Sequence, residues 1–219
     1  KFPPHASRIS TAGVKRPVFS YGYQLIDDIE GNLDGRAQRG EKLRLLVRVK
    51  NTGVGPALKA VTRLKNLAGL GVFIRKGRFV LGRLEAGETK TAAFTLDLQK
   101  SFSMRTFKLE LSVYDDGLRE IITDKLKFPV ADSKEAPKAA KGVARITSGE
   151  APFVAWPEDG APVVGYAKKG AAFKILGRYP GWYRVRASAG QPAYLAERLV
   201  TPGRQAGRST FIPRFTVTP

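Results

Sequence analysis

The chain has 219 residues, of which 42% are hydrophobic, and this composition excludes an intrinsically disordered protein. It contains no cysteine and a single histidine, His5, so disulfides, thiolate metal sites and zinc sites are excluded. Lysine and arginine total 38 against 19 acidic residues, and the net charge of +19 favours attraction to polyanions. Because this charge is spread along the chain, it would equally serve solubility and the protection of edge strands.

Residues 17–130 show short stretches of alternating apolar and polar residues separated by turn residues. The clearest stretch is 42–50, where leucine and valine alternate with lysine and arginine. Several such strands without a helical pattern predict a two-sheet sandwich of immunoglobulin type. The residues predicted to face its core are Leu45, Val47, Phe94, Leu96, Phe107, Leu109, Leu111 and Val113.

The tract 27–41 between the first two strands is rich in oxygen ligands. From Glu30 the spacing is that of a twelve-residue calcium loop, because acidic or amide residues recur two apart and a glutamate closes the loop. Arg36 and Arg39 lie inside it and would weaken cation binding, and the alternative is a plain turn between strands. The calcium ligands predicted by the spacing are Glu30, Asn32, Asp34 and Glu41, with Asp27 or Asp28 in reserve.

The same tract carries a family resemblance. The motif at 27–35, followed by 38–41 and 51–53, resembles the opening of CARDB-like, immunoglobulin-type adhesion modules of bacterial surface and secreted proteins. Together with the tracts 20–28 and 71–77, it also resembles the accessory region of myxobacterial carboxyl-terminal-processing serine peptidases. This resemblance implies a periplasmic or extracellular location and an attached peptidase domain, whose catalytic residues have no counterpart in this chain.

Residues 131–142 contain no bulky apolar side chain. Such a composition is typical of a solvated linker, so the sequence predicts one module at 17–130 and another beginning at 143.

Residues 143–202 contain five or six shorter strands, which must close on one another to bury a core, as in a small barrel. The tracts 169–177 and 181–186 resemble the lysine-glycine and Gly-Trp-x-x-Val patterns of bacterial SH3-like domains. The predicted fold class is therefore all-β, an immunoglobulin-like β-sandwich linked to a small SH3-like β-barrel.

SH3-like modules commonly bind envelope or peptide ligands, and the aromatic residues predicted to contact one are Trp182, Trp156, Tyr166 and Tyr194. The alternation of side chains places Tyr183 in the barrel core and Trp182 on its groove face.

Residues 203–219 begin with a glycine-containing connector and end in a strand-like tract, which is interpreted as the start of a further domain. No apolar run of about 18 residues occurs in the sequence, so no transmembrane helix is predicted.

Two functions remain open at this point. The first is a non-catalytic accessory region that docks an attached peptidase domain, a peptide or the cell envelope. The second is a polyanion-binding protein acting on nucleic acid or acidic polysaccharide through the outward-facing Arg44, Arg48 and Lys50. An enzyme is not expected, because the sequence shows no paired nucleophile and base. Calcium is the one cofactor the sequence suggests.

Overall fold

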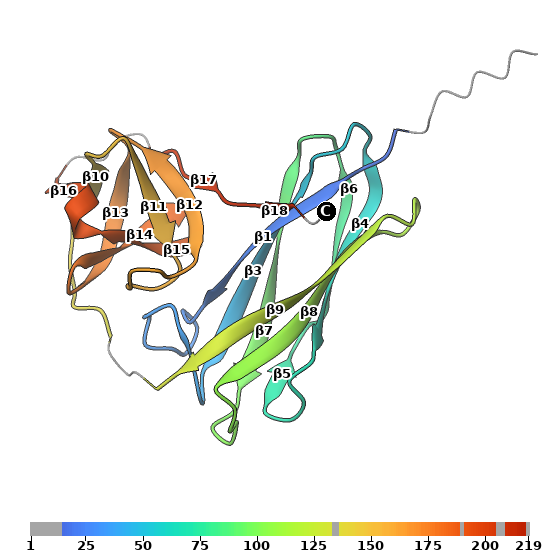
Figure 1. The fold of residues 1–219 in the computed structure, drawn as a ribbon, viewed down its shortest axis with the longest axis horizontal. Helices are drawn as coiled ribbons and strands as arrows, with labels where there is room; N and C mark the ends of the chain where they lie inside the picture. Colours follow the sequence, from blue (N-terminus) through green and yellow to red (C-terminus); the bar gives the residue numbers. More distant parts are fainter. Residues whose placement is uncertain (1–14, 133–135, 189–190, 205–208, 218–219) are drawn as a thin grey trace, which may run out of the picture.

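The computed structural model describes residues 15–132, 136–188, 191–204 and 209–217. Over these residues the protein is all-β, as predicted, and its one helical element is the short 3-10 helix η1 (Glu197–Leu199). The strands form two modules, which lie side by side in Figure 1.

The described residues contain no helix long and apolar enough to cross a membrane.

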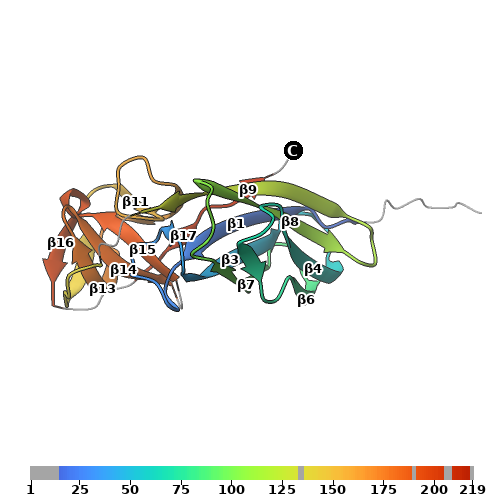
Figure 2. The same cartoon turned by 90° about the horizontal axis from the view of Figure 1, so that it is seen from below.

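The first module is a sandwich of two sheets, whose layers are seen edge-on in Figure 2. One sheet has the order β18 (Thr216–Val217), β1 (Phe19–Ile26), β3 (Lys42–Asn51), β7 (Thr89–Leu98) and β5 (Val72–Ile74). The other has the order β2 (Ala37–Gln38), β9 (Ile121–Ala131), β8 (Thr106–Asp115), β4 (Ala57–Asn66) and β6 (Arg78–Leu84).

The core of the sandwich lies between these two sheets. All eight residues predicted to face it are at most 1% exposed and belong to one hydrophobic cluster. The reason is the two-residue period of a strand, which sends every second side chain of β3, β7 and β8 to the inner face. The prediction of the sandwich core is therefore confirmed.

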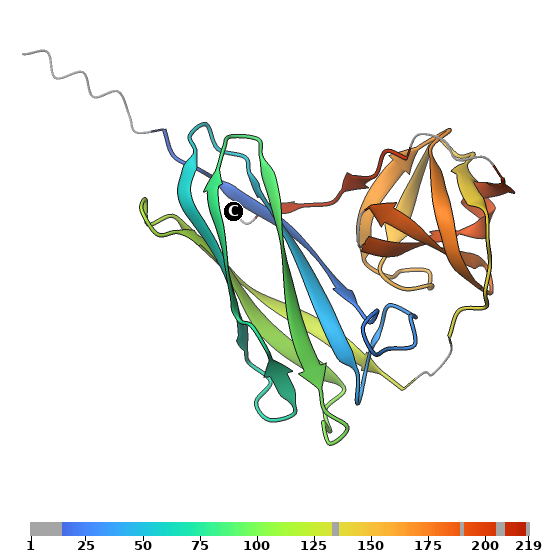
Figure 3. The ribbon, with the colours of Figure 1, turned by 180° about the vertical axis from the view of Figure 1, so that it is seen from behind.

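The second module is one eight-stranded sheet that curls around its own core (Figure 3). Its core contains Phe153, whose ring packs edge-on against Phe173 and Phe211 at centroid distances of 4.8 and 5.2 Å. The strands, in spatial order, are β16 (Val200–Gly203), β10 (Val143–Ile146), β13 (Ala172–Tyr179), β14 (Trp182–Ser188), β15 (Gln191–Ala196), β11 (Glu150–Val154), β12 (Val163–Lys168) and β17 (Ile212–Pro213).

The C-terminal segment differs from its prediction. Its residues 211–217 do not stand apart as the start of another domain, because they add a strand to each existing module. In β17, Ile212 pairs with Tyr166 of the second module, and in β18, Thr216 pairs with Tyr21 of the first. The red segment in Figures 1 and 3 thus crosses from one module to the other.

The predicted linker is also attached in part. Residues 133–135 lie outside the described part of the chain, but Lys138 exchanges two backbone hydrogen bonds of 2.9 Å with Arg178 of β13. Ala140 packs against the core of the second module. The absence of bulky apolar side chains had predicted a solvated linker. The hydrogen bonds at Lys138 need no such side chains, because they are made by backbone groups.

Candidate functional site

The two modules are joined by buried glutamine side chains. Gln24 of β1 is 4% exposed, and Gln191 of β15 is 2% exposed. Gln24 Nε2 donates to Pro192 O at 2.7 Å, and Gln191 Nε2 donates to Gln24 Oε1 at 2.7 Å. Buried amides that satisfy one another across a contact fix the relative position of the two surfaces.

The tract 27–41, which we call the acidic loop, forms a second part of this contact. Tyr194 of β15 donates its hydroxyl to Leu33 O at 2.6 Å, and Leu33 has a φ of 69°, uncommon for a residue with a side chain. Gly35 has a φ of 80°, and a Cβ there would collide with Ala155 O of the second module. The backbone of the loop is therefore shaped to the surface of the other module.

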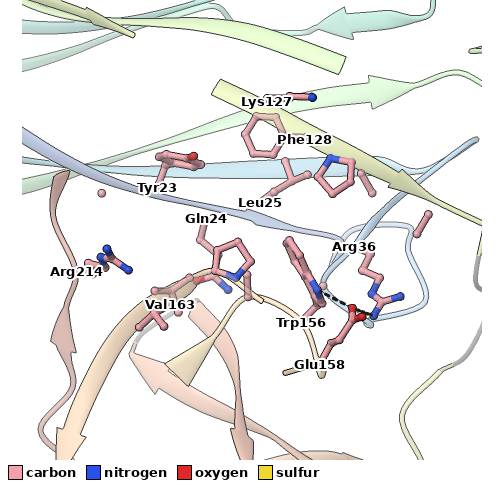
Figure 4. A pocket seen from close by; sticks show the side chains of 18 of the residues that line it. Tyr23, Gln24, Leu25, Arg36, Lys127, Phe128, Trp156, Glu158, Val163 and Arg214 are labelled. Carbon is pink, nitrogen blue, oxygen red and sulfur yellow. Dashed lines mark hydrogen bonds and ion pairs between the residues drawn. The ribbon is translucent and has the colours of Figure 1, made fainter. Parts of the chain in front are cut away.

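A groove of about 500 Å³ lies between the modules, beside these contacts. Its first wall is formed by β1 and β9, where Tyr23 packs edge-on against Phe128 with ring centroids 5.8 Å apart. Its second wall comes from the other module and includes Trp156 and Val163. Figure 4 shows Tyr23, Leu25 and Phe128 on one side of β1 and Trp156 and Val163 on the other. The size and the largely apolar walls are those of a ligand-binding cleft.

The rim of the groove is mainly positive. At one end Arg36 pairs with Glu158 at 2.6 Å, and Trp156 Nε1 donates to the same carboxylate at 3.2 Å. The other lining cations are Lys127 and Arg214, both exposed, and neither has an ion pair among the described residues. Two cationic side chains therefore remain available to a ligand.

The acidic loop does not have the arrangement predicted for calcium. Glu30 pairs with Lys42 and Asp28 with Arg44, so these carboxylates turn toward β3. Within the described ranges no group of three acidic or histidine side chains could hold a metal ion.

The remaining predicted calcium ligands are occupied by hydrogen bonds inside the loop. Asp34 accepts from the backbone N–H of Arg36 at 2.8 Å and from Gln38 Nε2 at 2.6 Å. Asn32 accepts from Asp34 N at 3.2 Å, and Glu41 accepts from Gln38 N at 2.9 Å. These hydrogen bonds hold the tract as a turn between β1 and β3, which was the alternative to a calcium loop.

Three buried carboxyls of the loop nevertheless influence one another. The pKa of Asp27 is raised to about 6, chiefly by burial and also by the nearby Asp34 carboxyl. Burial is also the main cause that raises the pKa of Glu41 to about 7. The pKa of Asp34 is raised by burial as well, although the Arg36 charge opposes this. The carboxyl groups of Asp27 and Glu41 therefore exchange protons near neutral pH, in the loop that contacts the second module.

The predicted aromatic ligand residues are placed differently from one another. Trp156 lines the groove, whereas Tyr194 is 1% exposed and serves the module contact, so it is not available to a ligand. Trp182 is half-buried against the small cluster that contains Tyr179 and Tyr194, and Tyr183 is half-buried against the main core of the module. Both are therefore partly packed and neither lines the groove, so the predicted division into one core residue and one groove residue is not seen. Tyr166 is half-buried beside β17.

The three basic residues predicted to face solvent all contact other side chains, and one of them, Arg48, lies at the module contact. Arg44 pairs with Asp28, and Arg48 donates to Gln191 and lies 5.7 Å above the Phe211 ring centroid. Burial lowers the pKa of Arg48. Lys50 Nζ lies 5.9 Å from the Phe215 ring centroid. Sequence alternation identified the outer face of β3 correctly, but it does not show that the second module and the C-terminal segment cover that face.

Sequence reasoning missed Tyr23, Phe128 and Lys127 as lining residues. Their strands were predicted, but the groove exists only because the second module packs beside them. The sequence did contain one sign of this packing, Gly22, because a glycine inside a strand often marks the close approach of another backbone. In the structure, a Cβ at Gly22 would collide with Arg214 O.

Comparison with known proteins gives similarities in structure alone. No protein-family model matches the sequence, and no curated protein matches it. Among solved structures, the chain is similar to the CARDB domain of the PF1109 protein from Pyrococcus furiosus, which was solved with di-metal ions. The identity is 13% and the TM-score 0.37, covering 54% of this chain and 96% of that one.

A FixG-related protein from Vibrio parahaemolyticus is 15% identical with a TM-score of 0.34, covering 50% of this chain and 95% of that one. The YadV chaperone is 11% identical with a TM-score of 0.29, covering 74% of this chain and 92% of that one.

Proposed function

We propose that this chain is a non-catalytic binding region that docks a partner in the groove between its two modules. The observation that carries the proposal is the groove itself, which combines apolar walls from both modules with unpaired cations at the rim. A surface built from two modules and held by buried glutamines is pre-organised for binding, which reduces the entropy lost when a ligand docks.

The lining chemistry supports binding rather than catalysis. Glu158 is the one carboxylate among the residues that line the groove, and it is already paired with Arg36. Glycoside hydrolysis needs two carboxyl groups, and acyl transfer needs a nucleophile beside a base. The groove residues supply neither arrangement.

The sequence resemblances carry the finer part of this proposal. The sandwich would be a CARDB-like module and the curled sheet an SH3-like barrel, in a larger secreted or envelope protein of the carboxyl-terminal-processing peptidase type. Such a region would act outside the cytoplasm, where it would position the peptidase domain or dock it on a protein or envelope component.

The alternative proposal is a polyanion-binding protein that acts through its charge of +19. It has less support, because Arg44, Arg48 and Lys50 each already contact another side chain of the chain. Binding of this kind would be lost steeply as salt is raised, whereas docking in an apolar groove would largely survive.

Filling the groove tests the proposal. We expect Val163→Trp to abolish the binding of peptides selected from a displayed random library on the whole chain, because the indole would occupy the space between the walls. The matched control is Val80→Trp, a valine that is 55% exposed on β6, away from the groove. Circular dichroism would establish that both variants fold.

Peptides that bind the two tryptophan variants equally well would show that the groove is not the docking site. Binding only to heparin or DNA, lost at moderate salt, would favour the polyanion alternative.

A further inference from the structure

The first wall of the groove contains an unpaired strand edge. Thr52 N donates to Val18 O at 2.7 Å, so the even-numbered residues of β1 direct their backbone polar groups toward β3. The backbone groups of the odd-numbered residues therefore point the opposite way. On that side β18 pairs with β1 only at Ser20 and Tyr21.

Beyond this pairing, Tyr23 and Leu25 direct their backbone groups toward the groove. On this side of β1, away from β3, no strand of the described part of the chain pairs with these two residues, and both line the groove. Each presents one N–H and one carbonyl group, the pattern to which an added strand bonds.

The opposite edge, on β9, is less suitable. Val130 N donates to Arg105 O at 2.9 Å, so the groove-lining residues of β9 whose backbones face away from β8 are Lys127, Pro129 and Ala131. Ala131 is already paired with Gln38 of β2. Pro129 has no N–H to donate, as is typical of a protected edge. The edge of β1 is therefore the one that can accept a strand.

We propose that an extended peptide segment of a partner, carrying consecutive apolar side chains flanked by carboxylates, adds to β1 at Tyr23 and Leu25. This proposal rests on the proposed function and names its ligand. The chain itself shows that the edge accepts a strand, because β18 pairs with the two preceding positions.

The side chains of the groove determine the chemistry of the segment. In an added strand, successive side chains would point in turn toward Phe128 and toward Trp156 and Val163. Apolar groups fit both walls. Lys127 and Arg214 at the rim lack ion-pair partners among the described residues, so carboxylates on the segment complement them.

The test uses the whole chain and a synthetic, end-capped peptide in which a run of valines is flanked by glutamates. Trp182→Phe leaves Trp156 as the only tryptophan, and its fluorescence reports occupation of the groove. We expect saturable binding, with slower hydrogen exchange at the amides of Tyr23 and Leu25. A peptide N-methylated on the edge-facing amides should bind about tenfold more weakly, because it cannot donate to the strand.

Charge reversal tests the choice of ligand. The double variant Lys127→Glu with Arg214→Glu should bind about tenfold more weakly. Lys125→Glu, on the same strand but outside the groove lining, should bind like the unaltered chain.

Each other outcome overturns a distinct claim. Equal affinity for the N-methylated peptide, without protection of Tyr23 and Leu25, would exclude strand addition but leave docking in the groove intact. Stronger binding of a valine–lysine peptide would contradict the proposed acidic ligand. Failure of the valine–glutamate peptide, where the library yields peptides sensitive to Val163→Trp, would overturn this inference alone. If no peptide, from the library or synthetic, bound in a way that Val163→Trp abolishes, both this inference and the proposed function would be overturned.

Discussion

Tyr194→Ala is expected to lower the free energy of unfolding by about 3–5 kcal/mol, the usual cost of removing a large buried aromatic side chain. Tyr194 is 1% exposed and packs against Tyr179 with ring centroids 5.9 Å apart. Its hydroxyl also closes the contact with Leu33 of the other module. Denaturant-induced unfolding, followed by circular dichroism, would measure the loss.

Two further variants separate the ring from the hydroxyl. Tyr194→Phe keeps the packing and loses one hydrogen bond, so it should cost only about 1 kcal/mol. Tyr166→Ala is the matched control, because this tyrosine is half-buried and should cost less than Tyr194→Ala. If Tyr194→Ala left stability unchanged and weakened only ligand binding, Tyr194 would be the ligand contact predicted from the sequence.

Raising the pH from about 4 to about 8 should lower the free energy of unfolding of the first module by on the order of 3 kcal/mol. The pKa of Glu41 is about 7 in the folded chain against 4.5 without burial, and that of Asp27 is about 6 against 3.8. Between these values the folded chain binds more protons than the unfolded chain, so stability falls as the pH rises. The dependence should level off above about 7, where both states are ionised.

Urea unfolding at a series of pH values would measure this slope. Glu41→Gln should flatten it, because the amide remains neutral and keeps one carbonyl acceptor for the N–H groups of the loop. Glu110→Gln, which removes a carboxyl on β8 outside the loop, should leave the slope unchanged. A stability that rises with pH across this window would show that the loop carboxylates are stabilised by cations instead.

The sequence was sufficient to predict those features that depend only on residues close together in the chain. Alternation along 42–50 identified both the buried and the outer face of β3, because strand geometry alone decides which side chains share a face. For the same reason, the core residues of β7 and β8 were predicted correctly. Trp156 was recognised as a candidate contact from its residue type, and it lines the groove.

Contacts between distant parts of the chain could not be predicted in this way. Tyr194 has the same local pattern whether its hydroxyl meets water or Leu33, and only the packing of the acidic loop decides this. Likewise, Arg48 has the pattern of an exposed strand residue, and it becomes half-buried because β15 and Phe211 cover it. The groove depends on such packing throughout.

The pairing of β1 with β18 also has a consequence for the order of folding. These are the first and last strands of the described residues, so Ser20 and Tyr21 meet their partners only after the chain has been synthesised as far as residue 217. The sandwich can assemble its core from residues 19–131, but its outer edge stays open until the second module has formed and β18 has returned. Closing so long a loop is slow, and an open edge is a site of intermolecular pairing. A nascent chain is therefore expected to be most prone to aggregation in the interval between these two events.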